Sequence, residues 1–201
     1  MGGGMGMPRF ESAVVGNLEL TWLIPLALIG TICGWLYFVS EHASEALAHA
    51  IGARPVVKAM LAGLALAICG TVLPYTLFAG ETQADVLMET YLTIPAGVLI
   101  ATGLVKAMLT PALISLGWRG GHFFPVIFSG VSLGYGLAIL TGADPVFCVA
   151  VCTASTMGAV MRQPVMVVGL LLMCFPLKGI VCMIIAAVIA AGIPLPKPLR
   201  K

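Results

Sequence analysis

The chain has 201 residues, of which 60% are hydrophobic and only 9% are charged. Soluble domains carry roughly 25% charged residues, so this composition excludes a soluble protein and predicts one that lies in a lipid bilayer. The formal net charge of +2 is small and dispersed along the chain, which excludes a nucleic acid as partner.

The charged residues divide the chain into uncharged segments of unequal length. Some of these segments reach the roughly 20 residues that a helix needs to cross the hydrocarbon of a bilayer, and others are too short to cross alone. We therefore predict an all-α, polytopic membrane protein with tilted, broken and re-entrant helices. The uncharged segments are 20–40, 59–80, 90–105, 107–118, 123–143, 145–161, 163–177 and 179–196.

Glycine and proline residues mark the predicted ends of the helices. The first helix is apolar at its start and amphipathic at its end, and Gly30 and Gly34 have the small-xxx-small spacing that lets membrane helices approach closely. Asp144 followed by Pro145 predicts a helix start, with a capping carboxylate and a proline at the first position. In chain order the predicted helices are 18–50, 56–72, 82–89, 94–116, 124–140, 145–159, 164–175 and 179–191.

Three regions follow from these helices. Residues 1–17 are predicted to be a flexible N-terminal segment, and residues 18–193 a membrane region of about eight helices. Residues 194–201 form a basic tail, which the positive-inside tendency places in the cytoplasm.

The segment GWRGGHFFP (117–125) is a glycine-broken turn that opens a helix. Gly120 and Gly121 allow the backbone to turn sharply and to present bare N–H groups, and Pro125 suits the first turn of a helix. A helix N-terminus carries unpaired donors and a partial positive charge. The pattern predicts an intramembrane anion site made of backbone amides; the alternative is a plain break between two helices.

Five short motifs resemble those of one family of membrane proteins. The pair KAMLT (106–110) and GWRGGHFFP (117–125) resembles the Lys-x-x-x-Thr…Gly-x-x-Gly-Gly-x-Phe-x-Pro signature of the chloride channel and proton–chloride antiporter (CLC) family. SGVSLG (129–134), FAGE (78–81) and RQP (162–164) also resemble segments of that family. The resemblance covers roughly 18–191 and corresponds to the C-terminal half of the CLC fold.

The resemblance implies a function in chloride or anion transport, with no catalytic activity and no cofactor besides the anion itself. It implies that Gly121, His122, Phe123, Phe124 and Pro125 form the anion-binding loop, in which His122 and Phe123 supply backbone N–H groups. It also implies an integral membrane protein, in a bacterial inner membrane, that forms a dimer through about 164–191.

Other parts of the family's pore are missing from this sequence. The chain contains no Gly-Ser-Gly-Ile-Pro loop and no Gly-x-x-Gly-x-Glu segment, whose glutamate is the gate in the family. The family also has a tyrosine that caps the anion site from a final helix. This tyrosine has no counterpart here, because the last tyrosine is Tyr135. We therefore expect it to act with a complementary N-terminal half or with a second copy. The alternatives are a dual-topology homodimer and a non-transporting remnant or packing subunit.

Three side chains near the turn have two interpretations each. Arg119 and Lys106 are candidates for a pore mouth that concentrates anions; alternatively, Arg119 extends to the membrane interface and Lys106 marks the wet end of a tilted helix. His122 either titrates near neutral pH and makes anion occupancy depend on pH, or contributes only its backbone N–H.

The remaining histidines and the cysteines carry weaker signals. His42, Glu45 and His49 share one helical face, which fits either a metal site or, as we favour, a solvated face. The six cysteines lie in apolar segments, where thiols behave as small hydrophobic groups. No paired catalytic residues, metal-binding motif or phosphate loop is present, so we predict neither an enzyme nor a metal centre.

Overall fold

The computed structural model describes residues 9–196, which are all-helical and contain no strand. Of the predicted end segments, residues 1–8 and 197–201 lie outside the described residues. Two short 3₁₀ helices, η1 (Pro74–Thr76) and η2 (Tyr91–Thr93), flank the third α-helix. The α-helices are α1 (Asn17–Ile51), α2 (Pro55–Val72), α3 (Glu81–Thr90), α4 (Ala96–Ser115), α5 (Phe123–Thr141), α6 (Pro145–Met161), α7 (Pro164–Leu171) and α8 (Ile180–Gly192).

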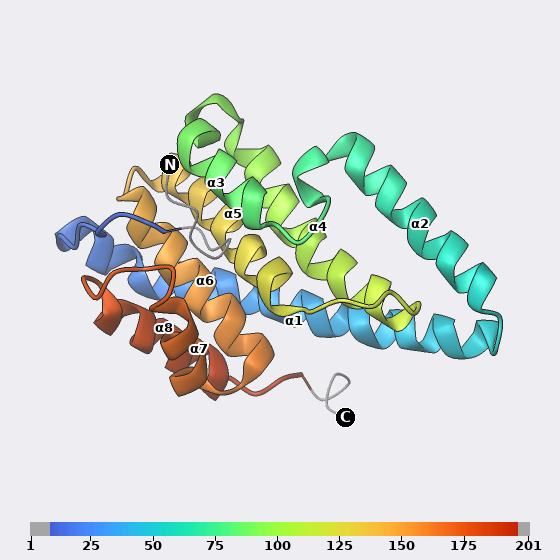
Figure 1. Ribbon diagram of the computed structural model, residues 1–201. Coiled ribbons are helices and arrows are strands. Elements are labelled where there is room, and N and C mark those ends of the chain that lie inside the picture. The colour runs from blue at the N-terminus through green and yellow to red at the C-terminus, as the bar shows by residue number, and fades with distance from the viewer. Residues whose placement is uncertain (1–8, 197–201) are drawn as a thin grey trace.

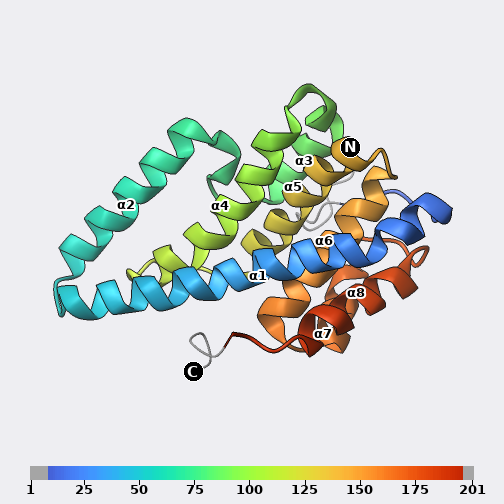
Figure 2. The same ribbon diagram turned by 180° about the vertical axis from the view of Figure 1, so that it is seen from behind.

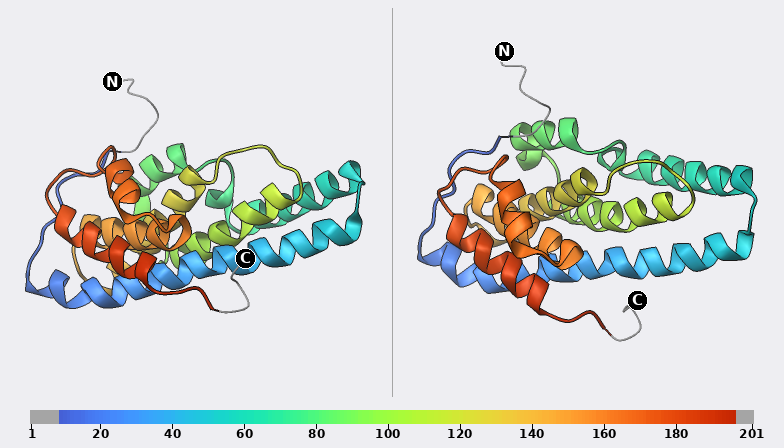
Figure 3. Two further views of the ribbon diagram at one scale, coloured as in Figure 1. Left: turned by 90° about the horizontal axis from the view of Figure 1, so that it is seen from below. Right: turned by 60° about the horizontal axis from the view of Figure 1, so that its bottom comes forward.

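Helix α5 is the centre of the packed body. Every residue from Pro125 to Ala138 in it is buried, because α4 and α6 pack on it. Helix α1 runs along one side and crosses both α4 and α6 (Figures 1 and 3). Helices α7 and α8 lie at one end of the molecule and α2 at the other (Figure 2), where Ala62 is the single buried residue of α2.

The small residues of α1 allow α6 to approach its backbone. A Cβ atom on Gly34 would lie 2.5 Å from the Cβ of Ala159, and one on Gly30 would overlap the Ser155 hydroxyl. Thr156 uses this approach to donate its hydroxyl to the Gly30 carbonyl at 3.2 Å. The close packing predicted from the Gly30–Gly34 spacing is confirmed.

Within residues 9–196, four helices are long and apolar enough to cross a bilayer: α1, α2, α4 and α5. Helices α6 and α8 are apolar but shorter. With 35 residues, α1 is about 50 Å long at the usual rise per residue, which exceeds the roughly 30 Å of bilayer hydrocarbon. The predicted combination of spanning and shorter helices is therefore present.

The chain before α1 packs against the end of α7, a contact that the sequence analysis misses. The Phe10 N–H donates to the Cys174 carbonyl at 2.9 Å, and its ring stacks on Phe175 with centroids 4.4 Å apart. Helix α7 ends at Leu171 rather than at the predicted residue 175. The backbone there tightens into i→i+3 bonds, such as the one from the Cys174 N–H to the Leu171 carbonyl, and this turns the Cys174 carbonyl toward Phe10.

Arg162 joins the end of α6 to the end of α8. Its backbone has a left-handed φ of 57°, and its Nη1 donates to the carbonyls of Ala191 at 2.9 Å and Ile193 at 2.7 Å. These carbonyls lie at the C-terminus of α8, where a cation also interacts favourably with the helix dipole.

We expect Arg162→Gln to lower the free energy of unfolding by about 1–3 kcal/mol, because hydrogen bonds from a charged donor are lost. Thermal unfolding of the purified chain in detergent, followed by circular dichroism, measures this. Arg54→Gln is the matched control, since Arg54 is exposed and a surface change shifts stability by less than about 0.5 kcal/mol. Equal losses in the two variants would contradict the role of Arg162.

Candidate functional site

The turn between α4 and α5 begins at a glycine other than the two expected from the sequence. Gly117 has a φ of 97°, and its N–H donates to the Ile114 carbonyl at 2.9 Å. Gly120 and Gly121 do not adopt positive φ. A Cβ on Gly121 would have no atom within 4 Å, so this part of the loop is open, and the sharp turn is made by Gly117.

Helix α5 begins without a cap. Its first residue is Phe123, one earlier than predicted, and no side chain accepts a hydrogen bond from its first turn. Within the described chain, the N–H groups of His122, Phe123 and Phe124 have no acceptor, and the first bond of the helix runs from the Val126 N–H to the His122 carbonyl. Pro125 lies in this first turn, as predicted.

The start of α6, unlike the start of α5, is capped by a side chain. Its cap, Asp144, accepts a hydrogen bond from the Phe147 N–H at 2.8 Å, as the sequence predicts. A capped N-terminus of this kind has fewer donors to offer. The N-terminus of α5 keeps its donors and its partial positive charge for solvent or for a ligand.

His122 packs among aromatic rings. Its imidazole stacks on Phe123 with centroids 4.7 Å apart and an interplanar angle of 19°. It also meets the edge of Tyr37 on α1 at 6.5 Å. The side chain of His122 is therefore in contact with α1, while its backbone lies at the helix start.

A cavity of about 390 Å³ lies beside this loop. Three residues of the predicted site line this cavity: Gly121, Pro125 and Lys106. Arg119 is exposed and does not line it. Phe124 lines a separate cavity of about 10 Å³. The lining of the larger cavity is Leu66, Leu77, Phe78, Ala79, Lys106, Thr110, Leu113, Ile114, Trp118, Gly120, Gly121 and Pro125.

The Lys106 ammonium group is buried and anchors a distant loop. The residue is 4% exposed, and its Nζ donates to the carbonyls of Thr76, at 2.7 Å, and of Phe78. Phe78 has a left-handed φ of 59°, so the loop between α2 and α3 is held in an unusual conformation against α4. Sequence reasoning misses this contact, and the pore-mouth roles of Lys106 and Arg119 stay predictions.

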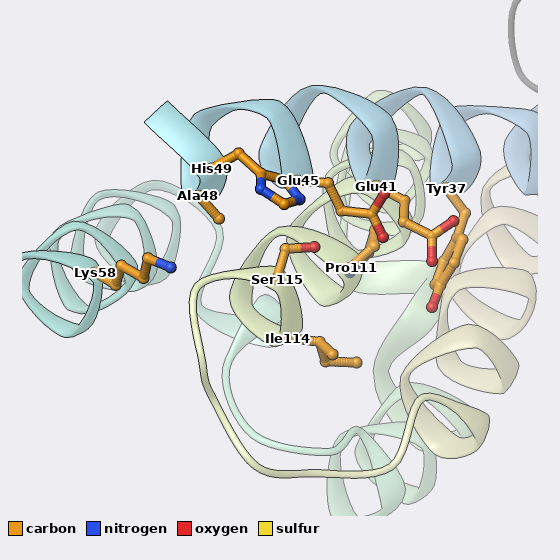
Figure 4. A pocket seen from close by; sticks show the side chains of 9 residues that line it. All are labelled: Tyr37, Glu41, Glu45, Ala48, His49, Lys58, Pro111, Ile114 and Ser115. Atoms are coloured by element: carbon orange, nitrogen blue, oxygen red, sulfur yellow. The ribbon is translucent and has the colours of Figure 1, made fainter. Parts of the chain in front are cut away.

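A second cavity, of about 450 Å³, lies between the polar end of α1, α2 and α4 (Figure 4). Glu45 and His49 line this cavity, but His42 does not. The structure therefore brings together two of the three residues that the sequence places on one helical face. Across the described residues, no group of three or more histidine, cysteine or acidic side chains is placed to hold a metal ion. The cavity is lined by Tyr37, Glu41, Glu45, Ala48, His49, Lys58, Pro111, Ile114 and Ser115.

These features define a polytopic, all-helical membrane protein whose central helix starts at an open, uncapped loop. A family model described as "Voltage gated chloride channel" matches residues 5–194, so the chain belongs to that family. The resemblance to the CLC family is confirmed, and the chain is an integral membrane protein.

The solved structures include a similar fold. A crystal structure of a CLC-type fluoride/proton antiporter superposes with a TM-score of 0.76 at 22% sequence identity, covering 97% of this chain and 49% of that one. The chain therefore spans about half the length of that antiporter, and the predicted half of a CLC-type fold is confirmed. No curated protein matches the chain.

Proposed function

We propose that the protein transports a chloride-like or fluoride-like anion across a membrane and that this chain supplies the Gly-x-Phe-x-Pro loop of the anion site. The observation that carries the proposal is the uncapped N-terminus of α5, where the amides of His122 and Phe123 have no acceptor in the described chain. Membership of the voltage gated chloride channel family supports the same function.

The backbone donors suit an ion that must enter and leave. A transport site has to replace the water around the ion and still release it. Peptide dipoles at a helix start attract an anion without a full positive charge. Lys106 directs its ammonium group to the carbonyls of Thr76 and Phe78, so the proposal assigns the anion to the backbone amides at the start of α5.

A complementary partner completes the pore in this proposal. The similar antiporter is about twice as long as this chain, so the partner is an N-terminal half or a second copy. Helices α7 and α8 support a dimer through about 164–191, because they carry exposed apolar side chains. These are Val165, Met166, Val181, Ile184, Ile185 and Val188.

The amide of Phe123 is the sharpest test. Phe123→Pro removes this N–H at the first helical position, where the helix itself makes no use of it, and Phe123→Ala removes the ring but keeps the N–H. We expect the proline variant to bind anions about 10- to 100-fold more weakly than the alanine variant, the equivalent of one charge-assisted hydrogen bond. Isothermal titration of the purified chain with sodium fluoride and with sodium chloride measures the two affinities.

Transport is tested with the partner present. Liposomes that contain the chain together with a CLC N-terminal half, or the chain alone, are loaded with chloride and followed with an anion electrode. Equal binding and flux in the proline and alanine variants, with helix content unchanged by circular dichroism, would show that the Phe123 amide is not a ligand.

A further inference from the structure

A further cavity, of about 390 Å³, lies where the segment before α1 crosses the loop that joins α7 to α8. Figure 3 shows this segment passing beside that loop. Arg9 and Phe10 line one side of the cavity, and residues 172–176 line the other. The cavity shares no lining residue with the one beside the anion loop or with the one at the polar end of α1, so it is a separate place on the molecule.

Packing holds the walls of this cavity in place. The Phe10 ring stacks on Phe175 with an interplanar angle of 6°, and the two side chains are 6% and 3% exposed. Ala13 is buried as well, and a Cβ on Gly179 would lie 3.5 Å from its side chain. The left-handed φ of 98° at Gly179 lets the loop turn into α8 at this contact. The cavity is therefore formed before any ligand binds, as is usual for binding sites.

The cavity lies at the level where two apolar helices begin. The uncharged segments of α1 and α8 start at Leu20 and at Gly179, and the contact of Ala13 with Gly179 brings these starts to the same end of the molecule. Because an ionised side chain is costly in hydrocarbon, the exposed Arg9 and Lys178 indicate the boundary between hydrocarbon and water. The cavity is thus placed at the depth of lipid headgroups.

The groups around the cavity favour an anion that carries hydroxyl groups. Arg9 lines the cavity, Lys178 follows its wall by two residues, and Glu11 is the one acidic residue among them, which leaves an excess of one positive charge. The carbonyls of Leu172 and Met173 accept no hydrogen bond from residues 9–196. Such carbonyls are open to hydroxyl donors.

We propose that this cavity binds the headgroup of an anionic phospholipid that carries hydroxyl groups, for which phosphatidylglycerol is the example. The phosphate lies beside Arg9, and Lys178 adds to the positive potential there. The headgroup hydroxyls donate to the carbonyls of Leu172 and Met173. The acyl chains run along the exposed side chains of the same loop, Leu172, Met173 and Leu177. The proposal rests on the membrane location of the chain and not on anion transport.

Amide hydrogen exchange reports directly on whether the cavity is occupied. The N–H groups of residues 172–175 are all hydrogen-bonded within the turn that ends α7, so they exchange only when this wall opens. A ligand that binds the closed wall makes opening rarer. With the full chain in nanodiscs, we expect exchange of residues 172–175 to be at least about fivefold slower in phosphatidylglycerol mixed with phosphatidylcholine than in phosphatidylcholine alone. Equal exchange in the two membranes overturns the proposal.

Charge changes test the position of the phosphate, and the readout is the fraction of phosphatidylglycerol that gives half of the protection. Arg9→Gln should raise this fraction about fivefold, the usual contribution of one cation beside an anionic membrane. Glu11→Gln removes a repulsive charge and should lower it by a similar factor. Arg54→Gln is the matched control, because Arg54 is exposed at the far end of α1, and it should leave the fraction unchanged. An unchanged fraction in Arg9→Gln rejects the phosphate site.

The headgroup is tested by exchanging the lipid. Phosphatidic acid is at least as negative but has no headgroup hydroxyls, and we expect about fivefold more of it to be needed for the same protection, because the carbonyls lose their donors. Equal protection by the two lipids overturns the role of the hydroxyls. Inorganic phosphate added to phosphatidylcholine nanodiscs should give no protection. Protection by phosphate alone assigns the cavity to a soluble anion and overturns the lipid.

Discussion

Gly134→Ala is expected to separate α5 from α6 and to be among the most destabilising single changes in the chain. A Cβ at this position would lie 2.5 Å from the Cα of Val149 and 2.9 Å from the Cys148 carbonyl oxygen. Both are backbone atoms, so no rotamer change relieves the overlap. Overpacking costs typically about 1–3 kcal/mol, and we expect the upper end because two helices must move.

Gly63→Ala is the matched control. Gly63 lies in α2, has ordinary φ and would have no atom within 4 Å of a Cβ. Alanine is favoured over glycine by about 1 kcal/mol inside a helix, so this variant should be as stable as the unaltered protein or more so. Thermal unfolding and the monodisperse fraction after detergent extraction compare the two. Equal stability of both alanine variants would mean that α5 and α6 do not pack as described.

Lys106→Met is expected to release the loop between α2 and α3. Methionine has a similar length, but it donates no hydrogen bond to the carbonyls of Thr76 and Phe78, which the ammonium group now satisfies. A polar group left unpaired inside a protein costs about 1–3 kcal/mol. Since two carbonyls are affected, we expect a loss of about 2–5 kcal/mol in unfolding free energy.

The loop itself provides the second measurement for Lys106→Met. Amide hydrogen exchange of residues 75–80 should accelerate in this variant more than exchange in α5, because the anchor acts locally. Lys178→Met is the control, since Lys178 is exposed and its replacement should change stability by less than about 0.5 kcal/mol. Unchanged exchange in the loop would show that the ammonium group does not hold it.

Local patterns in the sequence were enough to predict the class of the protein and most of its helices. The small number of charged residues predicts that the chain lies in a bilayer, because an ionised side chain is costly in hydrocarbon. The start of α6 followed from Asp144-Pro145, and the contact of α1 with α6 from Gly30 and Gly34. These features act over one turn of helix, so the residues that carry them are neighbours in the chain.

Part of the candidate site was predicted because it, too, depends on residues that are neighbours in the chain. The helix start at Phe123 and the position of Pro125 are local, whereas the left-handed residue proved to be Gly117.

Only the tertiary structure decided which distant groups meet. The carbonyls of Thr76 and Phe78 lie about 30 residues before Lys106, and the contact of Phe10 with Phe175 joins the segment before α1 to the segment after α7. The contact of Tyr37 with His122 also joins residues that are far apart in the sequence. Each depends on the path of the chain through space, which side-chain order along one helix does not determine.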